Sequence, residues 1–158
     1  MLSSEDFWHY SIRVYSEDAV KQLCLRLQDE AQLNVNLLLL CGYLDNSGVY
    51  LSAEHFNKLQ FAIKDLDALT QSVRAQRKAA KEVDQNRYQQ LLEHELQYEQ
   101  QQQQLLIETV QGLKIQRHKQ SNFDVYYHCL HHKGDPNLQK LLTTLQLLIT
   151  DEKIYIDD

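Results

Sequence analysis

The sequence predicts an all-α protein, and three observations support that fold class. Four glycines and one proline among 158 residues are too few turn residues for a protein made of short strands. Apolar residues recur in steps of three and four along most of the chain, which is the spacing of one helix face. Serine, asparagine and aspartate stand just before several of these segments, where their side chains can cap helices. We therefore expect one domain over residues 1–158, an irregular bundle of about six or seven helices.

The amino-terminal part of the chain holds two amphipathic helices and one buried helix. Ser3 or Ser4 is placed to cap a first helix with several aromatic residues, and Ser16 is placed to cap a second. Asn34 precedes a third helix over residues 35–44, which is apolar nearly all round. Such a helix has neighbours on every side, so we place it at the centre of the bundle.

A long helical hairpin is expected over residues 53–111. Its first helix follows the capping residue Ser52, and a polar stretch at 82–86 either bends this helix or reverses the chain. On the second helix we expect one apolar side, formed by Tyr88, Leu92, Leu96, Leu106 and Val110. Five consecutive glutamines, Gln100–Gln104, occupy its middle, and we interpret them as a solvated face because glutamine forms helices well.

Two shorter helices complete the predicted bundle. Ser121 or Asn122 can cap a sixth helix that is rich in aromatic residues. Asp135 followed by Pro136 is a strong start signal for the last helix, since aspartate caps well and proline fits the first helical position. Leucines at helical spacing over residues 138–148 give that helix a buried face.

Charge and cysteine content limit the environment in which the protein works. The net charge of −6 gives the protein as a whole no attraction for nucleic acid or anionic lipid, so such binding requires a local patch. The amino terminus has neither the basic start nor the apolar core of a signal peptide. The most apolar run, residues 33–44, reaches roughly 18 Å as a helix, whereas a membrane span needs about 20 residues. The widely spaced Cys24, Cys41 and Cys129 then indicate reduced thiols, and we expect a cytoplasmic protein without a membrane partner.

A cluster of cations interrupts the apolar face of the long helix. From residue 59 to residue 73 the buried pattern follows one face, and the next position on that face is Arg77. Arg74, Lys78 and Lys81 lie within about 100° of each other around the same helix. Because clustered guanidinium and ammonium groups bind oxyanions, these four residues are candidates to contact an acidic partner.

Internal pairing is the alternative explanation of the cations. If the chain reverses near Asp84, the next helix runs antiparallel and brings Glu93 and Glu95 alongside Arg74 and Arg77. The pairs would then be ordinary salt bridges between helices, each contributing about 0–1 kcal/mol when exposed.

A second candidate site is polar and adjoins the predicted central helix. Gln28, Asp29 and Asn36 lie beside that helix, and buried polar groups must be hydrogen-bonded. These residues belong either to a buried polar network or to a small-molecule pocket. Trp8 and Tyr15 could form a wall of such a pocket, although aromatic residues at helical spacing usually belong to the core.

Metal and covalent chemistry are not expected. His128 and His132 lie one helical turn apart, as in paired-imidazole metal sites, but no carboxylate stands at ligand spacing and Cys129 points elsewhere. Cys24 and Cys41 lie on apolar faces, where thiols are usually inert. Nothing resembles a phosphate-binding loop, a paired-carboxylate di-iron set or a hydrolase triad. We therefore expect neither a metal nor another cofactor, and we do not predict an enzymatic activity.

Three segments in the first half of the chain carry a family resemblance. They are Phe7-Trp8-His9-Tyr10-Ser11, Cys24-Leu25-Arg26-Leu27-Gln28-Asp29 and Asn34-Val35-Asn36-Leu37-Leu38-Leu39. With these motifs the chain resembles a family of small, uncharacterised helical proteins from the cytosol of gamma-proteobacteria, and the similarity continues through Arg74, Arg77 and Lys81. The resemblance implies a bacterial, cytoplasmic protein, but the family has no assigned activity and so implies no mechanism.

The predicted function is that of a non-enzymatic cytoplasmic adaptor or binding protein that contacts an acidic protein or RNA through the basic helix face. The alternative is a small-molecule-binding protein or an enzyme, with a polar pocket formed by Trp8, Gln28, Asp29 and Asn36. The sequence leaves the oligomeric state open, including pairing of the long helices with a second copy.

Overall fold

Seven helices and no strand form the part of the chain that the structure describes. The structure is a computed structural model, and it describes residues 2–115, 118–130 and 134–150. The helices are α1 (Ser4–Tyr15), α2 (Asp18–Ala31), α3 (Val35–Asn46), α4 (Ala53–Ala80), α5 (Gln85–Gln111), α6 (Asn122–His128) and α7 (Pro136–Thr150). The all-α prediction, the expected number of helices and the long hairpin are confirmed. Across these described residues, no helix combines the length and the apolar character that crossing a membrane requires.

Most helices begin where local signals in the sequence predicted. The side chains of Ser3, Asn34 and Ser52 each accept a hydrogen bond from a backbone N–H in the first turn of α1, α3 and α4, at 3.0, 3.1 and 3.2 Å. The last helix starts at Pro136, as expected. Ser16 does not cap α2, because it directly follows α1 and its hydroxyl donates to a carbonyl of that helix.

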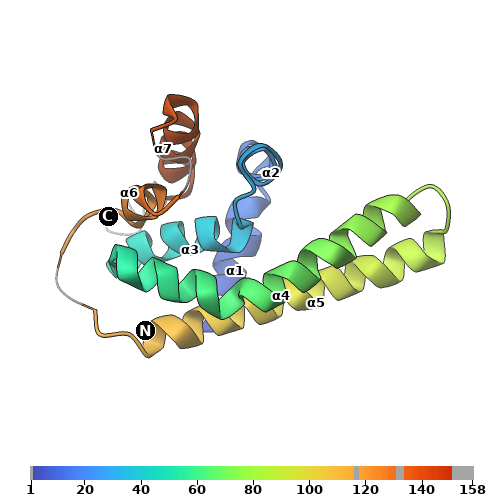
Figure 1. Cartoon of the computed structure of the whole chain (residues 1–158), viewed down its shortest axis with the longest axis horizontal. Coiled ribbons are helices and arrows are strands. Elements are labelled where there is room, and N and C mark those ends of the chain that lie inside the picture. The colour runs from blue at the N-terminus through green and yellow to red at the C-terminus, as the bar shows by residue number, and fades with distance from the viewer. Residues whose placement is uncertain (1, 116–117, 131–133, 151–158) are drawn as a thin grey trace.

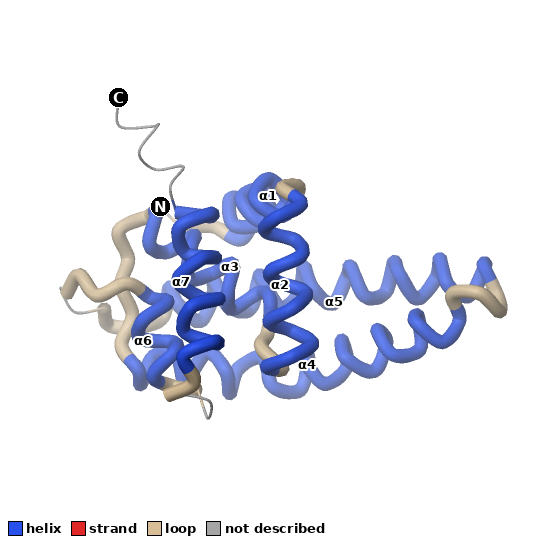
Figure 2. The backbone as a smooth tube through the Cα atoms, turned by 90° about the horizontal axis from the view of Figure 1, so that it is seen from above, coloured by secondary structure: helices blue, strands red, loops and turns tan. Residues whose placement is uncertain are grey.

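The hairpin of α4 and α5 is the longest part of the molecule, and the other helices gather around one half of it. Its far half, with the turn that joins the two helices, projects beyond the rest of the protein (Figures 1 and 2). On the near half, α5 contacts α1 and α3, and α4 contacts α6. Helices α2 and α7 pack together on the side of α3 that faces away from the hairpin (Figure 1).

The central position predicted for residues 35–44 is confirmed. Helix α3 contacts α1, α2, α5, α6 and α7, and every residue from Asn36 to Leu44 is buried. Gly42 permits the close approach of α7, since a Cβ at this position would lie 2.6 Å from the Ile149 side chain and would also meet the Tyr10 hydroxyl. That hydroxyl donates to the Ile149 carbonyl at 2.9 Å, which ties α1 to the end of α7.

Polar residues occupy core positions where α4 meets α5. Thr70 and Arg77 lie on the buried face of α4, and opposite them on α5 lie Gln102 and Glu95. The Gln102 amide donates to the Thr70 hydroxyl at 2.7 Å, and Arg77 Nε donates to a Glu95 oxygen at 3.0 Å. The hairpin is therefore an antiparallel helix pair with polar layers inserted into its apolar seam.

The buried face of α5 includes the predicted Leu106 and Val110, but it differs from the prediction in the first half of the helix. Leu92 and Leu96 were expected on the apolar side, but they are 38% and 49% exposed. Leu91 and Glu95 face α4 instead. The reason is the partner that α4 offers: because Arg77 is available at the seam, a glutamate can be buried there in place of a leucine.

The glutamine run is likewise not a uniformly solvated face. Gln102 and Gln103 are 1% and 2% exposed, so the prediction is wrong for these two residues. Gln100 and Gln104 are exposed. The run thus spans the helix from its solvent side to its core side. Polar groups on α1, α3 and α4 accept hydrogen bonds from the amide nitrogens of the two buried residues, while the side-chain oxygen of Gln103 has no hydrogen-bond partner among the described residues.

Candidate functional site

Two asparagines at the start of α3 link that helix to the hairpin. Asn34 accepts the capping hydrogen bond of α3, and its amide donates to Asp67 of α4 at 2.9 Å and to Gln102 of α5 at 3.0 Å. The Asn36 amide also donates to Gln102, at 3.2 Å. Both asparagines of the Asn-Val-Asn segment therefore form hydrogen bonds that connect the start of α3 with the hairpin helices, which are far from it in the sequence.

The buried glutamines extend these ties into a directed chain of hydrogen bonds. Gln103 donates to Asn36 at 3.0 Å, Asn36 donates to Gln102, and Gln102 donates to Thr70. A second bond from Gln103 reaches the Ser11 hydroxyl of α1 at 2.9 Å. In a low-dielectric interior, aligned bonds of this kind strengthen one another, whereas a broken link leaves buried groups unsatisfied. The network thus fixes the polar side chains of α1, α3, α4 and α5 relative to each other.

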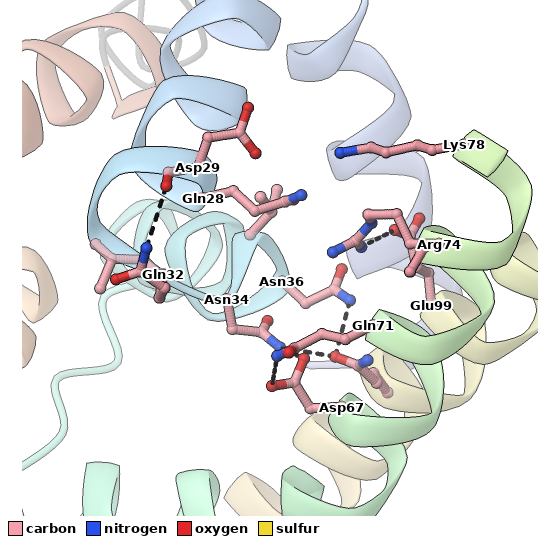
Figure 3. Close-up of a pocket in the computed structure, with 14 residues that line it drawn as sticks. Gln28, Asp29, Gln32, Asn34, Asn36, Asp67, Gln71, Arg74, Lys78 and Glu99 are labelled. Atoms are coloured by element: carbon pink, nitrogen blue, oxygen red, sulfur yellow. Dashed lines mark hydrogen bonds and ion pairs between the residues drawn. The ribbon is translucent and has the colours of Figure 1, made fainter.

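A cavity of about 310 Å³ opens beside this network, between the α2–α3 junction and the middle of the hairpin (Figure 3). We call it the amide pocket, because six of its lining residues carry carboxamides. The lining residues are Gln28, Asp29, Gln32, Leu33, Asn34, Val35, Asn36, Asp67, Gln71, Arg74, Ala75, Lys78, Glu99 and Gln102.

The two walls of the amide pocket come from different parts of the chain. One wall is the end of α2 with the start of α3, where the chain turns through Gln32, whose φ of 54° is left-handed. The other wall is the middle of α4 and α5. Figure 3 shows Arg74 and Lys78 extending from α4 towards Gln28 on the opposite wall. The volume lies at the lower end of the range for small-molecule sites, which is about 300–1,000 Å³.

Two arginines and two glutamates form an ionic cluster at the seam of the hairpin, next to the pocket. Arg77 lies 3.0 Å from Glu95, and Arg74 lies 3.7 Å from Glu95 and 3.3 Å from Glu99. The side chains of Arg77 and Glu95 are only 18% and 11% exposed. Burial raises the pKa of Glu99, although the positive charge of Arg74 acts in the opposite direction. The cluster explains why a cation stands on the apolar face of α4.

Of the two glutamates expected to pair with the arginines, only Glu95 does so among the described residues. Glu93 is exposed, and Glu99 takes its place one helical turn further along α5. The ion pairs account for Arg74 and Arg77 without an external anion. Contact of these residues with an acidic partner stays a prediction.

Three charged groups that line the pocket have no ion-pair partner within the described part of the chain. The Asp67 carboxylate accepts hydrogen bonds only from neutral amides, those of Asn34 and Gln71, each at 2.9 Å. Asp29 and Lys78 are exposed at the rim. The pocket therefore presents uncompensated charge of both signs.

The structure brings the two predicted sites together in one place. Gln28, Asp29 and Asn36 of the predicted polar pocket line the amide pocket, and so do Arg74 and Lys78 of the basic stripe.

The remaining predicted residues lie elsewhere. Trp8 does not line the pocket. Arg77 lies behind Arg74 in the ionic cluster, and Lys81 is exposed beyond the end of α4. Tyr15 does not line the pocket either. Burial raises the pKa of Tyr15 to about 12; the negative charge of Glu99 acts in the same direction, and the positive charge of Arg74 acts against it.

The sequence alone did not point to Asp67, Gln71, Glu99 and Gln102. Asp67 and Gln71 lie one turn apart on α4, and the same spacing continues to Arg74 and Lys78, so a polar stripe beside the apolar face was visible in principle. Gln102 carried no such signal, because nothing in a run of identical residues indicates which member is buried.

The other candidate chemistry lies outside the amide pocket. Burial raises the pKa of Cys24 to about 12 and that of Cys41 well above its usual value, so neither thiol ionises readily. His128 is exposed at the end of α6, and its predicted partner His132 lies outside the described residues. Within the described ranges, no group of three or more His, Cys, Asp or Glu side chains is arranged to hold a metal ion.

Fold and site together define an all-α protein with a polar cavity between a helical hairpin and a central buried helix. Residues 6–106 match the family model described as "Protein of unknown function (DUF2390)", and the chain belongs to this family. All fourteen lining residues of the amide pocket, from Gln28 to Gln102, fall within the matched segment. No curated protein and no solved structure matches the chain. The predicted membership in an uncharacterised family is confirmed, while its gamma-proteobacterial range stays a prediction.

Proposed function

We propose that the protein binds a small polar ligand in the amide pocket and acts by binding rather than by catalysis. The observation that supports this most is the meeting of a buried polar network with an open cavity. A fold that needed only stability would gain more from apolar residues at these positions, because buried polar groups contribute little net free energy even when they are hydrogen-bonded. Here the carboxamides of Asn36 and Gln102 are buried and held in place, and they also line the pocket.

The composition of the lining favours recognition over covalent chemistry. Its residues include no cysteine, histidine, serine, threonine or tyrosine, so thiol, hydroxyl and imidazole nucleophiles are missing from the pocket wall. Six carboxamides offer both donors and acceptors, and the hydrogen-bond network fixes several of them. A rigid arrangement of this kind lowers the entropic cost of binding.

A thermal-shift screen with a library of polar metabolites tests this proposal. The wild type should be stabilised by at least one compound, because a ligand that binds only the native state raises the melting temperature. Ala75→Trp places a bulky side chain at the pocket wall and should abolish the shift. Ala79→Trp is the matched control, since Ala79 is an exposed alanine of the same helix that does not line the pocket. The proposal fails if no compound stabilises the wild type, or if the shift survives in Ala75→Trp.

Contact with an acidic protein or RNA through Arg74, Arg77, Lys78 and Lys81 is the second candidate function. The exposure of Lys78 and Lys81 near the projecting end of the hairpin favours it. A titration with salt separates the two candidates, because a basic-patch contact with RNA weakens steeply with ionic strength whereas a ligand in a small pocket responds little. Lys78→Gln combined with Lys81→Gln should abolish RNA binding while leaving the ionic cluster intact, and unchanged binding would exclude this candidate.

A further inference from the structure

We propose that the amide pocket binds a primary ammonium group at Asp67, carried by a compact polar ligand with a single positive charge. This inference rests on the proposed function and names the class of ligand. Three observations support it: a carboxylate without a counter-ion in the pocket, a free amide oxygen beside that carboxylate, and a negative net charge of the pocket wall.

Asp67 is a partly buried carboxylate that no cation neutralises. Its two oxygens accept one hydrogen bond each, at 2.9 Å, from the neutral side-chain amides of Asn34 and Gln71. Among the described residues no cation forms a salt bridge with it, and this includes Lys64 one turn earlier on α4. A carboxylate has about four lone-pair positions, so each oxygen can accept a further bond. An ammonium group supplies three donors, and its charge makes each bond to a carboxylate stronger than the bond from a neutral donor.

The chemistry of Asp67 also fixes the orientation of the two amides that contact it. Because an ionised carboxylate only accepts hydrogen bonds, Asn34 and Gln71 must both turn their nitrogen towards it. Asn34 uses its second N–H for Gln102 at 3.0 Å, and its oxygen caps α3 through the Leu37 N–H. The oxygen of Gln71 accepts no hydrogen bond within the described ranges. A group bound at Asp67 therefore finds a free acceptor next to the carboxylate.

The other amides of the pocket show the same imbalance. Of the six carboxamides in the lining, all but that of Gln28 already donate a hydrogen bond within the protein. The oxygen of Gln32, like that of Gln71, accepts none among the described residues. The oxygen side of these amides is thus less occupied than the nitrogen side, which suits a ligand that is rich in N–H and O–H donors.

The charge of the pocket wall favours a ligand with one positive charge. Three carboxylates and two cations line the pocket, which gives a net charge of −1; they are Asp29, Asp67, Glu99, Arg74 and Lys78. Arg74 and Glu99 already pair with each other, at 3.3 Å. A monocation neutralises the wall, whereas an anion would add to its negative charge and a dication would reverse its sign.

Lys78 is too far from Asp67 to replace the ligand or to prevent its binding. The two residues are eleven positions apart on α4, which corresponds to roughly 16 Å along the helix axis. Figure 3 shows Lys78 well away from Asp67, Asn34 and Gln71. Over that distance solvent and salt screen most of its repulsion. A ligand that carried a second positive charge towards Lys78 and Arg74 would be repelled there, so a polyamine fits this pocket poorly.

Size and lining narrow the class further. A cavity of about 310 Å³ suits a compact solute rather than a nucleotide or a long peptide. No aromatic side chain lines the pocket, and aromatic faces are the usual site for a quaternary ammonium group. The ligand is therefore a primary amine, bound through its N–H donors.

Calorimetric titration of the full chain at neutral pH tests the proposal with ethanolamine, serinol and glucosamine. Each amine is compared with the alcohol of nearly the same shape, which is ethylene glycol, glycerol or glucose, and ethanolamine also with its trimethyl derivative, choline. An amine found in the metabolite screen is compared with its alcohol in the same way. We expect the alcohols and choline to bind at least about tenfold more weakly than the amines, because they lose the charge or the N–H donors. An alcohol or choline that binds as tightly as its amine overturns the inference.

Variants locate the ammonium group. Asp67→Asn should weaken binding of the same amine at least about tenfold, because it removes the only charge that faces the ligand there. The matched control is Asp65→Asn, which removes an exposed carboxylate of the same helix that does not line the pocket, and should leave the affinity unchanged. Lys78→Gln should not weaken binding. An unchanged affinity in Asp67→Asn refutes the assignment, and should this variant fail to fold, the comparison of amine with alcohol on the wild type still decides the question.

The outcomes separate this inference from the proposed function. If only compounds without an ammonium group bind, and Ala75→Trp abolishes their binding, the proposed function stands and the ammonium site is excluded. If no amine binds and the metabolite screen also gives no shift, both proposals fail.

Discussion

Replacing Arg77 by methionine should destabilise the hairpin, because it leaves Glu95 at the seam without its nearest cation. Loss of one partner of a fully buried ion pair costs about 3–5 kcal/mol, whereas an exposed pair contributes about 0–1 kcal/mol. The side chains of Arg77 and Glu95 are 18% and 11% exposed, and Arg74 remains 3.7 Å from the same carboxylate oxygen. We therefore expect a loss of about 1–3 kcal/mol, between those limits.

Urea denaturation followed by circular dichroism measures this loss, and hydrogen exchange locates it. The seam near the ion pair is a small cluster of Val73, Ala80 and Leu91, so the far half of the hairpin should open before the rest of the protein. Amide exchange should then accelerate in residues 78–96 and remain slow in α3.

A double substitution and a matched control make the result decisive. Arg77→Met combined with Glu95→Leu removes both charges and should recover most of the lost stability, since an apolar pair of similar volume can replace a buried ion pair. Lys81→Met removes an exposed cation from the same hairpin and should change stability by less than about 0.5 kcal/mol. The reasoning is wrong if Arg77→Met is as stable as the wild type, or if the double variant is less stable than the single one.

Three further perturbations test other parts of the structure. Gln102→Leu should cost at least about 1–3 kcal/mol in urea denaturation, because the amides of Asn34 and Asn36 lose a buried acceptor; a neutral result would show that these amides find other partners. Gly42→Ala should cost about 1–3 kcal/mol through overpacking against Ile149, and an unchanged melting temperature would contradict the tight contact of α3 with α7. The folded-state pKa of Glu99 is raised above its ordinary 4.5, so ionisation of Glu99 opposes folding and its penalty grows as the pH rises above that value. Glu99→Gln should therefore be more stable than the wild type at neutral pH and equal to it below about pH 4.5, as melting temperatures across the pH range would show.

Local signals in the sequence predicted the helices well, and long-range packing explains where the predictions stopped. Capping residues such as Asn34 and Ser52 act within one turn, so the sequence reveals them directly. The buried face of α5 depends on which residues α4 places opposite to it, and hydrophobic periodicity cannot identify a core position that holds Glu95 or Gln102.

Long-range packing also explains why the sequence predicted two separate candidate sites where the structure has one pocket. Gln28 and Asp29 were assigned to one candidate and Arg74 and Lys78 to another, because about 45 residues separate them along the chain. Only the docking of the α2–α3 junction against the hairpin makes them neighbours. Conversely, Trp8 was included on residue type alone, and its place on α1 directs it to a different part of the molecule.

The polar layers of the hairpin also set its alignment. Two helices joined only by leucines can slide past each other by a heptad and still bury an equivalent surface, but a shift here would separate Arg77 from Glu95 and Thr70 from Gln102. One register is thus selected over its neighbours at some expense of stability. The residues of α4 that face α2 therefore keep a fixed position along the helix axis. The amide pocket depends on this, because its lining comes from segments that are far apart in the sequence.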